Sequence, residues 1–264
     1  MTAYQTITTS ITQDVMTITL NRPEKKNALS FVMMDELIHL AKTLKRNKSL
    51  KAVVITGSGT DFCSGLDLAD LNNSKNLLKA SYQLIKPTPS KFQQVCLIWQ
   101  SLPMPVIAVI KGVCVGGGLQ LALGADMRIA HPDARFSVLE AKWGLVADMG
   151  ITHTAGMIAK DKLAKLAMTA EIVDAKAAFD DGLVTIIDDE PMARANQLIA
   201  DIGSRSPDAV LAAKRIINAR SPINYLTLYQ EKLWQIRLML GHNRKLAIKK
   251  AKDSSVAFVR RQFG

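Results

Sequence analysis

The amino-acid sequence predicts an α/β fold in which strands alternate with helices. Two patterns indicate this: short runs of β-branched and apolar residues, and longer segments with apolar residues at helical spacing, with glycine or proline turns between them. The chain has 264 residues, of which 48% are hydrophobic, so it can bury a large core. We expect one main domain over residues 1–190 and a helical region over 191–264.

The first predicted elements are a strand, a loop and a helix. Residues 15–20 alternate apolar side chains with threonine, as a half-buried strand does. The charged segment 21–27 contains a proline and turn residues, which predicts a loop. Ser30 is then placed to cap a helix whose apolar residues recur at helical spacing. Those residues are Met33, Leu37, Leu40, Ala41 and Leu44.

The middle of the chain alternates buried strands with less regular sequence. Residues 51–56 predict a buried strand, which ends at Gly57-Ser58-Gly59. Residues 69–100 are polar, rich in lysine and interrupted by prolines, so we expect either a mobile flap or a surface insertion. A single apolar run follows over residues 106–115, and another short strand is predicted at 127–130.

The last hundred residues are predicted to be helical. One helix should end at Gly182, and Ser206-Pro207 should begin another. Residues 223–240 are densely apolar, too much so for a helix that is free on the surface. We therefore expect that segment to pack on the core or on another subunit.

The charge of the chain limits its partners. The formal net charge is +11, and much of the excess lies between residues 245 and 261. Such a surface suits nucleic acid, a membrane or a polyanionic small molecule, or is simply a solvated helix face. Aromatic residues make up only 5% and no nucleic-acid motif occurs, which argues against nucleic acid.

Neither a membrane nor a metal is predicted. The longest apolar stretch, 105–130, is broken by Lys111, glycines and Asp126, so it is unsuited to crossing a bilayer. The N-terminus begins with β-like alternation and has no targeting pattern, so we expect a cytoplasmic protein. The three cysteines are scattered and the four histidines lack metal-ligand spacing, which favours a reducing compartment and no metal site.

Three consecutive glycines, Gly116-Gly117-Gly118, are the most informative feature of the chain. They lie between the apolar run and a predicted helix, where backbone must approach something closely. Tight packing, phosphate binding and an oxyanion site on helix N-terminal amides all fit. The P-loop and G-x-G-x-x-G patterns are absent, which leaves packing or an oxyanion site. An oxyanion site needs a second N–H donor and acid–base groups nearby.

Several further motifs follow one another along the chain. They are Leu20-Asn21-Arg22-Pro23, Asn27-Ala28-Leu29, Phe62-Cys63-Ser64-Gly65-Leu66-Asp67-Leu68, Pro105-Val106-Ile107-Ala108, Ala125-Asp126-Met127-Arg128-Ile129-Ala130 and Gly144-Leu145-Val146. Together with Gly116-Gly117-Gly118 they closely resemble the crotonase, or enoyl-CoA hydratase/isomerase, family. The resemblance covers essentially the whole chain and implies a crotonase-type spiral of strand–strand–helix units, followed by a C-terminal helical trimerisation region. Family members commonly pair such trimers into hexamers.

The resemblance implies an oxyanion hole formed by the backbone N–H groups of Leu66 and Gly117. They would bind the thioester carbonyl of an acyl-CoA and stabilise the enolate formed when Cα loses a proton. Donors of this kind lower a barrier by roughly 3–4 kcal/mol each. Coenzyme A is then part of the substrate and no separate cofactor is implied. The residues implied to contact the acyl-CoA are Lys25, Ala28, Ser64, Gly65, Leu66, Asp67, Leu68, Gly116 and Gly117.

Within that set, two residues have narrower expected roles. Asp67 is expected to support its loop rather than react. Lys25, together with the C-terminal lysines, would neutralise the phosphates of coenzyme A. The basic charge then has a cause that needs no nucleic acid.

Acid–base residues decide which reaction follows. The resemblance assigns the two glutamate positions of the hydratases to Gln120 and Glu140. An amide cannot exchange protons at useful pH, although Gln120 can orient water or substrate. A further carboxylate, Asp148, stands where the dienoyl-CoA isomerases of the family have an acid, although those isomerases carry an aspartate at the position of Gln120.

Three functions stay open at this point. In the first, Glu140 and Asp148 transfer a proton along an enoyl- or dienoyl-CoA. In the second, a trans-2-enoyl-CoA hydratase uses Glu140 while Gln120 positions the water. In the third, a non-catalytic homologue binds CoA thioesters or RNA. We expect a homotrimer or hexamer, and residues 69–100 are expected to set acyl-chain selectivity.

Overall fold

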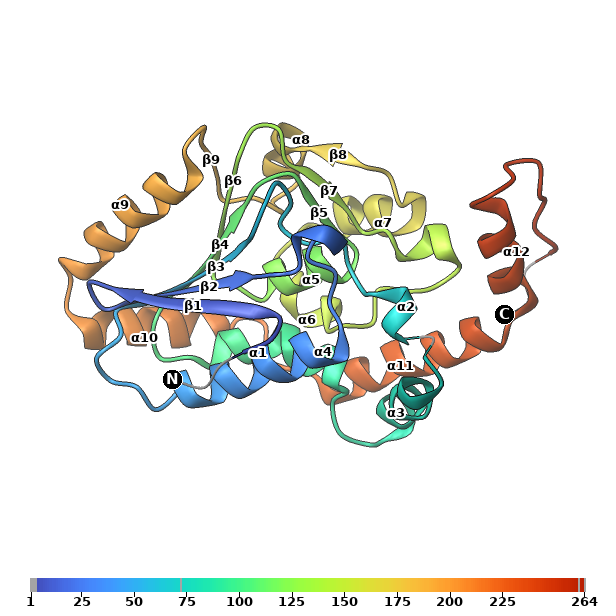
Figure 1. Cartoon of the computed structure of the whole chain (residues 1–264), viewed down its shortest axis with the longest axis horizontal. Coiled ribbons are helices and arrows are strands. Elements are labelled where there is room, and N and C mark those ends of the chain that lie inside the picture. Colours follow the sequence, from blue (N-terminus) through green and yellow to red (C-terminus); the bar gives the residue numbers. More distant parts are fainter. Residues whose placement is uncertain (1–3, 72, 261, 264) are drawn as a thin grey trace.

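The computed structural model describes residues 4–71, 73–260 and 262–263. Its strands form two sheets surrounded by helices (Figure 1). The larger sheet has the order β1-β2-β3-β4-β6-β9 and the smaller one β5-β7-β8. The strands are β1 Ile7–Thr12, β2 Val15–Leu20, β3 Ala52–Gly57, β4 Val106–Ile110, β5 Val113–Val115, β6 Met127–Ala130, β7 Arg135–Ser137, β8 Val173–Asp174 and β9 Ile186–Ile187.

Helices occupy most of the remaining chain. Three short 3-10 helices accompany the α-helices: η1 Pro23–Lys25, η2 Ile98–Ser101 and η3 Glu140–Trp143. The α-helices are α1 Phe31–Leu44, α2 Leu68–Leu71, α3 Ser74–Ile85, α4 Lys91–Leu97, α5 Gly117–Leu123, α6 Ile151–Thr154, α7 Lys160–Thr169, α8 Ala175–Asp180, α9 Pro191–Gly203, α10 Pro207–Asn218, α11 Tyr225–Leu240 and α12 His242–Lys250.

From β4 to β7 successive strands alternate between the two sheets, as expected for the predicted spiral. β4 joins the larger sheet and β5 the smaller; β6 then returns to the larger sheet and β7 to the smaller. Helix α5 follows the first of these pairs, and η3, α6 and α7 follow the second. From β2 to β9 the strands of the larger sheet are parallel, and only β1 is antiparallel to its neighbour.

The larger sheet is buried on both faces. On β3, Val53 and Ile55 face the main core, whereas Ala52 and Val54 face a second cluster on the other side. Helix α9 contributes Ala195 and Ile199 to that second cluster, so it covers the outer face. Parallel strands covered on both sides are apolar throughout. This is why the sequence over β3 and β4 shows no alternation.

The apolar run over residues 106–115 is divided between two sheets. Gly112 makes the turn between β4 and β5 with φ +55°. A Cβ there would lie 2.3 Å from the carbonyl oxygen of Thr60 and 2.6 Å from Oδ1 of Asp61. The close approach requires glycine, and it brings the segment after β3 beside β5.

Several predicted elements are confirmed at their ends. Strand β2 has its predicted bounds, and β3 is shifted by one residue from 51–56. Ser30 caps α1, with its Oγ accepting a hydrogen bond from the Met33 N–H at 3.1 Å. Ser206 is the N-cap of α10 with a proline in the first turn, and Gly182 follows α8 with φ +81°.

Residues 69–100, expected to be a mobile flap or a surface insertion, are largely helical. This segment contains α3 and α4 and most of α2. Ser90 and Gln93 form a reciprocal cap at the start of α4, with Ser90 Oγ accepting from the Gln93 N–H and Gln93 Oε1 accepting from the Ser90 N–H. A serine three residues before a glutamine is a helix-start signal, so the sequence did carry this information.

Helix α11 forms as predicted, but its orientation was not foreseen. It packs against α3 and is followed by α12, which packs against η3 at the opposite end of the molecule from α9 (Figure 1). Its buried side chains are Leu228, Glu231, Lys232 and Gln235, whereas apolar side chains such as Trp234 are exposed. Of the two alternatives expected for this segment, packing on the core of the same chain fails for most of its apolar residues, and packing on another subunit stays a prediction.

A substitution at Gly118 tests the packing at the glycine junction, the segment Gly116–Gly118 where β5 passes into α5. A Cβ there would lie 2.4 Å from the carbonyl oxygen of Cys63. We expect Gly118→Ala to lower the free energy of unfolding by about 3 kcal/mol or more, measured by denaturant titration. Gly203, at the end of α9, is the matched control because a Cβ there has no neighbour among the described residues within 4 Å. Gly203→Ala should be neutral or stabilise by up to about 1 kcal/mol. Equal stabilities of the two variants would contradict the packing described.

Candidate active site

Glycine is required at two of the three positions at the start of α5, for a different steric reason at each. Gly118 packs directly on Cys63, where any side chain would collide. Gly116 has φ +54°, and a Cβ there would lie 3.5 Å from Oε1 of Glu140. The packing interpretation therefore holds for Gly118, Gly116 brings the backbone close to a candidate acid–base residue, and the oxyanion site stays a prediction.

Gly117, the first residue of α5, lies against the loop that follows β3. A Cβ at Gly117 would be 2.9 Å from Sδ of Met149 and 3.4 Å from Cγ of Leu66. Gly65 has φ +100°, and a Cβ there would be 3.5 Å from the backbone nitrogen of Gly117. The structure thus brings together the two segments that the sequence singled out.

The backbone pairing between Leu29 and Leu66 leaves the N–H of Leu66 itself without an acceptor among the described residues. Leu29 forms a parallel bridge with Leu66, in which its N–H donates to the Gly65 carbonyl at 2.8 Å and its carbonyl accepts from the Asp67 N–H at 3.0 Å. In parallel pairing the N–H and carbonyl of Leu66 itself then point away from Leu29. Within the described part of the chain, neither Leu66 N–H nor Gly117 N–H has an acceptor. Two neighbouring free donors, one of them at a helix start, suit an oxygen that develops negative charge.

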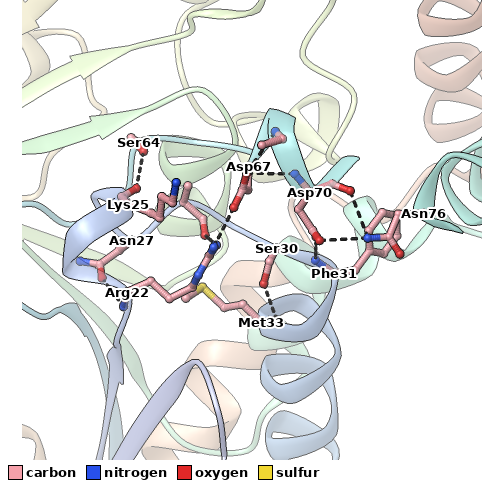
Figure 2. Close-up of polar contacts among 12 residues, drawn as sticks. Arg22, Lys25, Asn27, Ser30, Phe31, Met33, Ser64, Asp67, Asp70 and Asn76 are labelled. Atoms are coloured by element: carbon pink, nitrogen blue, oxygen red, sulfur yellow. Dashed lines mark hydrogen bonds and ion pairs between the residues drawn. The ribbon is translucent and has the colours of Figure 1, made fainter. Parts of the chain in front are cut away.

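An ion pair holds the loop that carries Leu66. Arg22 Nη2 donates to Asp67 Oδ2 at 2.7 Å, and Arg22 Nη1 donates to the Ala28 carbonyl at 2.7 Å. Burial alone would raise the pKa of Asp67, but the hydrogen bond from Arg22 holds it below its ordinary value. Asp67 Oδ1 also accepts from the Ala69 N–H (Figure 2). Asp67 therefore supports the loop, as the sequence predicted.

The remaining predicted CoA-contact residues lie around the same loop. Ser64 Oγ donates to the Lys25 carbonyl at 3.3 Å (Figure 2), Lys25 itself is exposed, and Ala28 is buried. Leu68 begins α2 and is 41% exposed. The structure brings these residues together, but the sequence did not reveal what fixes them. That residue is Asn27, fully buried, whose Nδ2 donates to the carbonyls of Ser58 and Asp61.

Glu140 and Gln120 form the buried polar centre of the site. Gln120 Nε2 donates to Glu140 Oε1 at 2.7 Å, and Gln120 Oε1 accepts from the Met149 N–H at 2.9 Å. The other carboxylate oxygen of Glu140 is buried and has no hydrogen-bond partner among the described residues. Burial raises the pKa of Glu140. One oxygen is thus fixed by Gln120, and the other is left to act on a ligand.

Asp148 lines a cavity of about 230 Å³ next to these groups. Leu66 lines the same cavity, so the carboxyl group and a residue of the donor loop share one space. Asp148 is 5% exposed and forms no ion pair within the described residues. Burial raises its pKa well above the ordinary value, and the charges of Glu231 and Glu140 raise it further. Asp148 therefore keeps its proton to a higher pH than a surface aspartate does.

Glu231 is a buried residue of the site that the sequence did not reveal. Its Oε2 accepts from the Gly150 N–H at 3.0 Å, and its Oε1 accepts from the Thr152 N–H at 3.0 Å and from Thr152 Oγ1 at 2.6 Å. Gln93 Nε2 also donates to Oε2 at 3.0 Å. Helix α11 thereby fixes the segment directly after Asp148. Only its position in an apolar helix distinguished this glutamate, and that signal is weak.

The described residues do not meet the requirements of metal sites, reactive thiols or membrane-spanning helices. No group of three or more histidine, cysteine or acidic side chains there is arranged to hold a metal ion. All three cysteines are buried and free, and burial raises the pKa of the Cys63 thiol to about 12. No helix among residues 4–71, 73–260 and 262–263 is long and apolar enough to cross a membrane.

The Arg22–Asp67 pair can be tested against an exposed pair of the same type. The two side chains are only 18% and 10% exposed. We expect Arg22→Met to lower the free energy of unfolding by about 1.5–3 kcal/mol, because it leaves Asp67 without its charged donor. Lys51→Met breaks the Lys51–Asp14 pair, whose side chains are 55% and 53% exposed, and should cost at most about 1 kcal/mol. Denaturant titration measures both, and a loss as small for Arg22→Met as for Lys51→Met would refute the supporting role.

The chain matches known families over nearly its whole length. The family model described as enoyl-CoA hydratase/isomerase matches residues 10–259. A mitochondrial Delta(3,5)-Delta(2,4)-dienoyl-CoA isomerase of Mus musculus is 34% identical over 224 residues, which are 80% of this chain and 68% of that protein. A probable enoyl-CoA hydratase of Mycobacterium leprae is 32% identical over 210 residues, which are 78% of this chain and 80% of that protein.

Solved structures agree with the fold. A putative enoyl-CoA hydratase from Streptomyces avermitilis has a TM-score of 0.84 at 23% identity, covering 97% of this chain and 94% of that chain. An enoyl-CoA hydratase/isomerase from Xanthobacter autotrophicus Py2 has a TM-score of 0.80 at 28% identity, covering 95% and 94%. The chain belongs to the enoyl-CoA hydratase/isomerase family and has the crotonase fold.

Proposed function

We propose that this protein is an isomerase that moves a proton along an enoyl- or dienoyl-CoA thioester through an enolate. The observation that carries the proposal is Asp148, a buried carboxyl group with a raised pKa in a cavity that Leu66 of the donor loop also lines. A relative that is 34% identical is named a Delta(3,5)-Delta(2,4)-dienoyl-CoA isomerase, which supports the same reaction class.

The two carboxyl groups have environments that suit opposite roles. Glu140 lies beside Gly116 and so near the place of a thioester carbonyl bound by Gly117, and one of its oxygens accepts a hydrogen bond from Gln120. Asp148 lies in the cavity, with neighbouring negative charges that favour its protonated form. Glu140 would therefore take the proton from C2, and Asp148 would donate one farther along the chain.

For a 3,5-dienoyl-CoA the proposed reaction balances without any other reactant. Removal of a proton from C2 gives a conjugated enolate, whose oxygen accepts hydrogen bonds from the N–H groups of Leu66 and Gly117. Protonation at C6 then gives the 2,4-dienoyl-CoA. No water is added and nothing is oxidised, so one carboxyl group ends protonated and the other ionised. Proton exchange with solvent restores the starting state.

Hydration of a trans-2-enoyl-CoA is the second candidate. It is supported by relatives named as probable hydratases. It requires Gln120 to position a water, yet the carbonyl of Gln120 is held by the Met149 N–H and its amide group donates to Glu140. One N–H of Gln120 is left for a water, and no second carboxylate is used. The geometry therefore favours the isomerase.

A binding protein without catalysis is the weakest candidate. The basic C-terminal residues would hold the phosphates of coenzyme A or RNA in that case. An RNA-binding role would require tight binding at physiological salt with a steep dependence on salt concentration. The buried carboxyl groups at the cavity have no use in such a protein, which favours an enzyme.

We also propose that the chain assembles into a trimer, or a hexamer of two trimers, in the cytoplasm. Helices α11 and α12 expose apolar side chains that their own chain leaves uncovered, among them Leu226 at 65%, Trp234 at 42% and Leu240 at 81% exposure. Large apolar side chains exposed on neighbouring helices are what the interface of an assembly would cover. The three buried, free thiols suit a reducing compartment.

A pair of substrates separates the two enzymatic candidates. We expect a 3,5-dienoyl-CoA to be converted with a change in absorbance and no uptake of water, and a 2-enoyl-CoA to be hydrated much more slowly. Glu140→Gln should lower kcat by at least about 100-fold, because the base is lost, while the dissociation constant for a saturated acyl-CoA stays within about threefold. Faster turnover of the 2-enoyl-CoA would favour the hydratase, and full activity of Glu140→Gln would exclude Glu140 as the base.

The buried Asp148 predicts an increase in stability when it is replaced. Its folded pKa lies above its unfolded value of about 3.9, so the wild-type protein loses stability as the pH rises from about 4 through the folded pKa. Asp148→Asn removes this loss. We expect its Tm to exceed that of the wild type more at pH 8 than at pH 5, while isomerisation falls by about 100-fold or more. The exposed Asp189 gives the control variant Asp189→Asn, which should change neither quantity. A lower Tm for Asp148→Asn at pH 8 would refute the burial cost.

A further inference from the structure

The cavity beside Asp148 contains a cation that its own chain does not neutralise. Arg244 of α12 lines this cavity together with Leu66, Phe92 and Trp143. Its Nη1 is shielded from solvent and has no hydrogen-bond partner among the described residues. The guanidinium also forms no ion pair with any of those residues. Burial lowers the pKa of Arg244, but a guanidinium stays protonated at any physiological pH.

Asp148 lines the same cavity but is not the partner of Arg244. No ion pair joins them, and the charges that act on Asp148 are those of Glu231 and Glu140. A guanidinium in contact with Asp148 would stabilise the ionised carboxylate and lower its pKa, whereas the pKa of Asp148 is raised well above the ordinary value. The cavity therefore holds a carboxyl group and a guanidinium at separate places on its wall.

The packing of α12 keeps Arg244 in this position. A Cβ at Gly144 would lie 3.1 Å from Cα of Arg244 and 3.1 Å from Cβ of Ala247. Gly144 follows η3, which begins with Glu140, so the helix that carries Arg244 rests directly on the turn after the candidate base. The arginine is thus tied to the site and is not part of a free tail.

A second hydrogen-bond donor lines the same cavity. Gln235 of α11 is 8% exposed, and its Oε1 accepts from the Val146 N–H at 3.1 Å. Its side-chain amide group donates to no acceptor among the described residues. Arginine is donor-only and Gln235 already uses its acceptor, so both groups can offer only N–H to a ligand. The rest of the wall is mostly apolar.

We propose that the acyl group of the substrate carries a carboxylate at the end away from the thioester, and that Arg244 and Gln235 bind it. A polar group shielded from solvent without a partner is unfavourable, and a ligand carboxylate would supply the partner that Nη1 of Arg244 lacks. Arginine binds carboxylates in two-pronged geometry with high specificity. The cavity volume of about 230 Å³ lies below that of typical ligand pockets, which restricts the acyl chain to a short one. The inference rests on the proposed acyl-CoA function.

Two saturated thioesters of equal chain length test the proposal without any catalytic step. The probes are adipyl-CoA, which ends in a carboxylate, and hexanoyl-CoA, which ends in a methyl group, titrated calorimetrically against the full chain. We expect the wild-type protein to bind adipyl-CoA about tenfold to a hundredfold more tightly. Arg244→Met should reduce this preference to less than about threefold, and Arg244→Lys should retain part of it.

Arg237→Met is the matched control. Arg237 lies exposed on α11 with its guanidinium 5.0 Å from the Trp234 ring, so this variant removes the same charge outside the cavity. It should leave the preference for adipyl-CoA unchanged. Equal binding of both thioesters by the wild type, or an unchanged preference in Arg244→Met, would overturn the inference about Arg244 alone. Failure to bind either thioester would overturn the proposed acyl-CoA function as well, and turnover of an uncharged 3,5-dienoyl-CoA with equal binding of both probes would leave that function standing.

Discussion

The contact between the loop after β3 and the glycine junction before α5 determines the rest of the site. Residues 63–66 lie against residues 116–118 so closely that Gly118 has no room for a side chain beside Cys63. The same contact places Leu66 against Gly117, while β4 and β5 separate at Gly112 and enter different sheets. Two donors from segments fifty residues apart in the sequence can act on one oxygen only if both sheets hold them in register.

Around that contact the protein buries carboxyl groups, although burial is unfavourable for their ionised form. Asp148, Glu140 and Glu231 are close enough for their charges to raise the pKa of Asp148. Glu231 receives four hydrogen bonds, whereas Asp148 has no charged partner among the described residues. A fold selected only for stability would satisfy both groups equally. A buried carboxyl group without a charged partner, next to one whose oxygens are hydrogen-bonded, is typical of a site where the requirements of catalysis reduce stability.

The sequence singled out Gly116–Gly118 by its own pattern, because three glycines between a strand and a helix indicate a close backbone approach. Gly65-Leu66 and Gln120 were identified through the family resemblance, and their roles stay predictions. Glu231 and Arg244 were not predicted, because they lie on α11 and α12, far in the sequence from the other residues of the site. Their roles depend on the direction in which those helices turn, and hydrophobic periodicity does not encode that direction when apolar residues occur on every face.

Polar residues determine which face of α11 turns toward the rest of the chain. Lys232 Nζ donates to the carbonyls of Lys86 and Thr88. Gln93 Nε2 donates to the carbonyl of Leu228 and to Glu231. These contacts join α11 to the segment 69–100, so the part of the chain expected to set acyl selectivity and the helix that fixes Asp148 form one unit. Exposed apolar side chains of α11, such as Leu226, Trp234 and Leu240, consequently lie outward, where the proposed assembly would cover them. Assembly would then act on the cavity through the helix that carries Glu231.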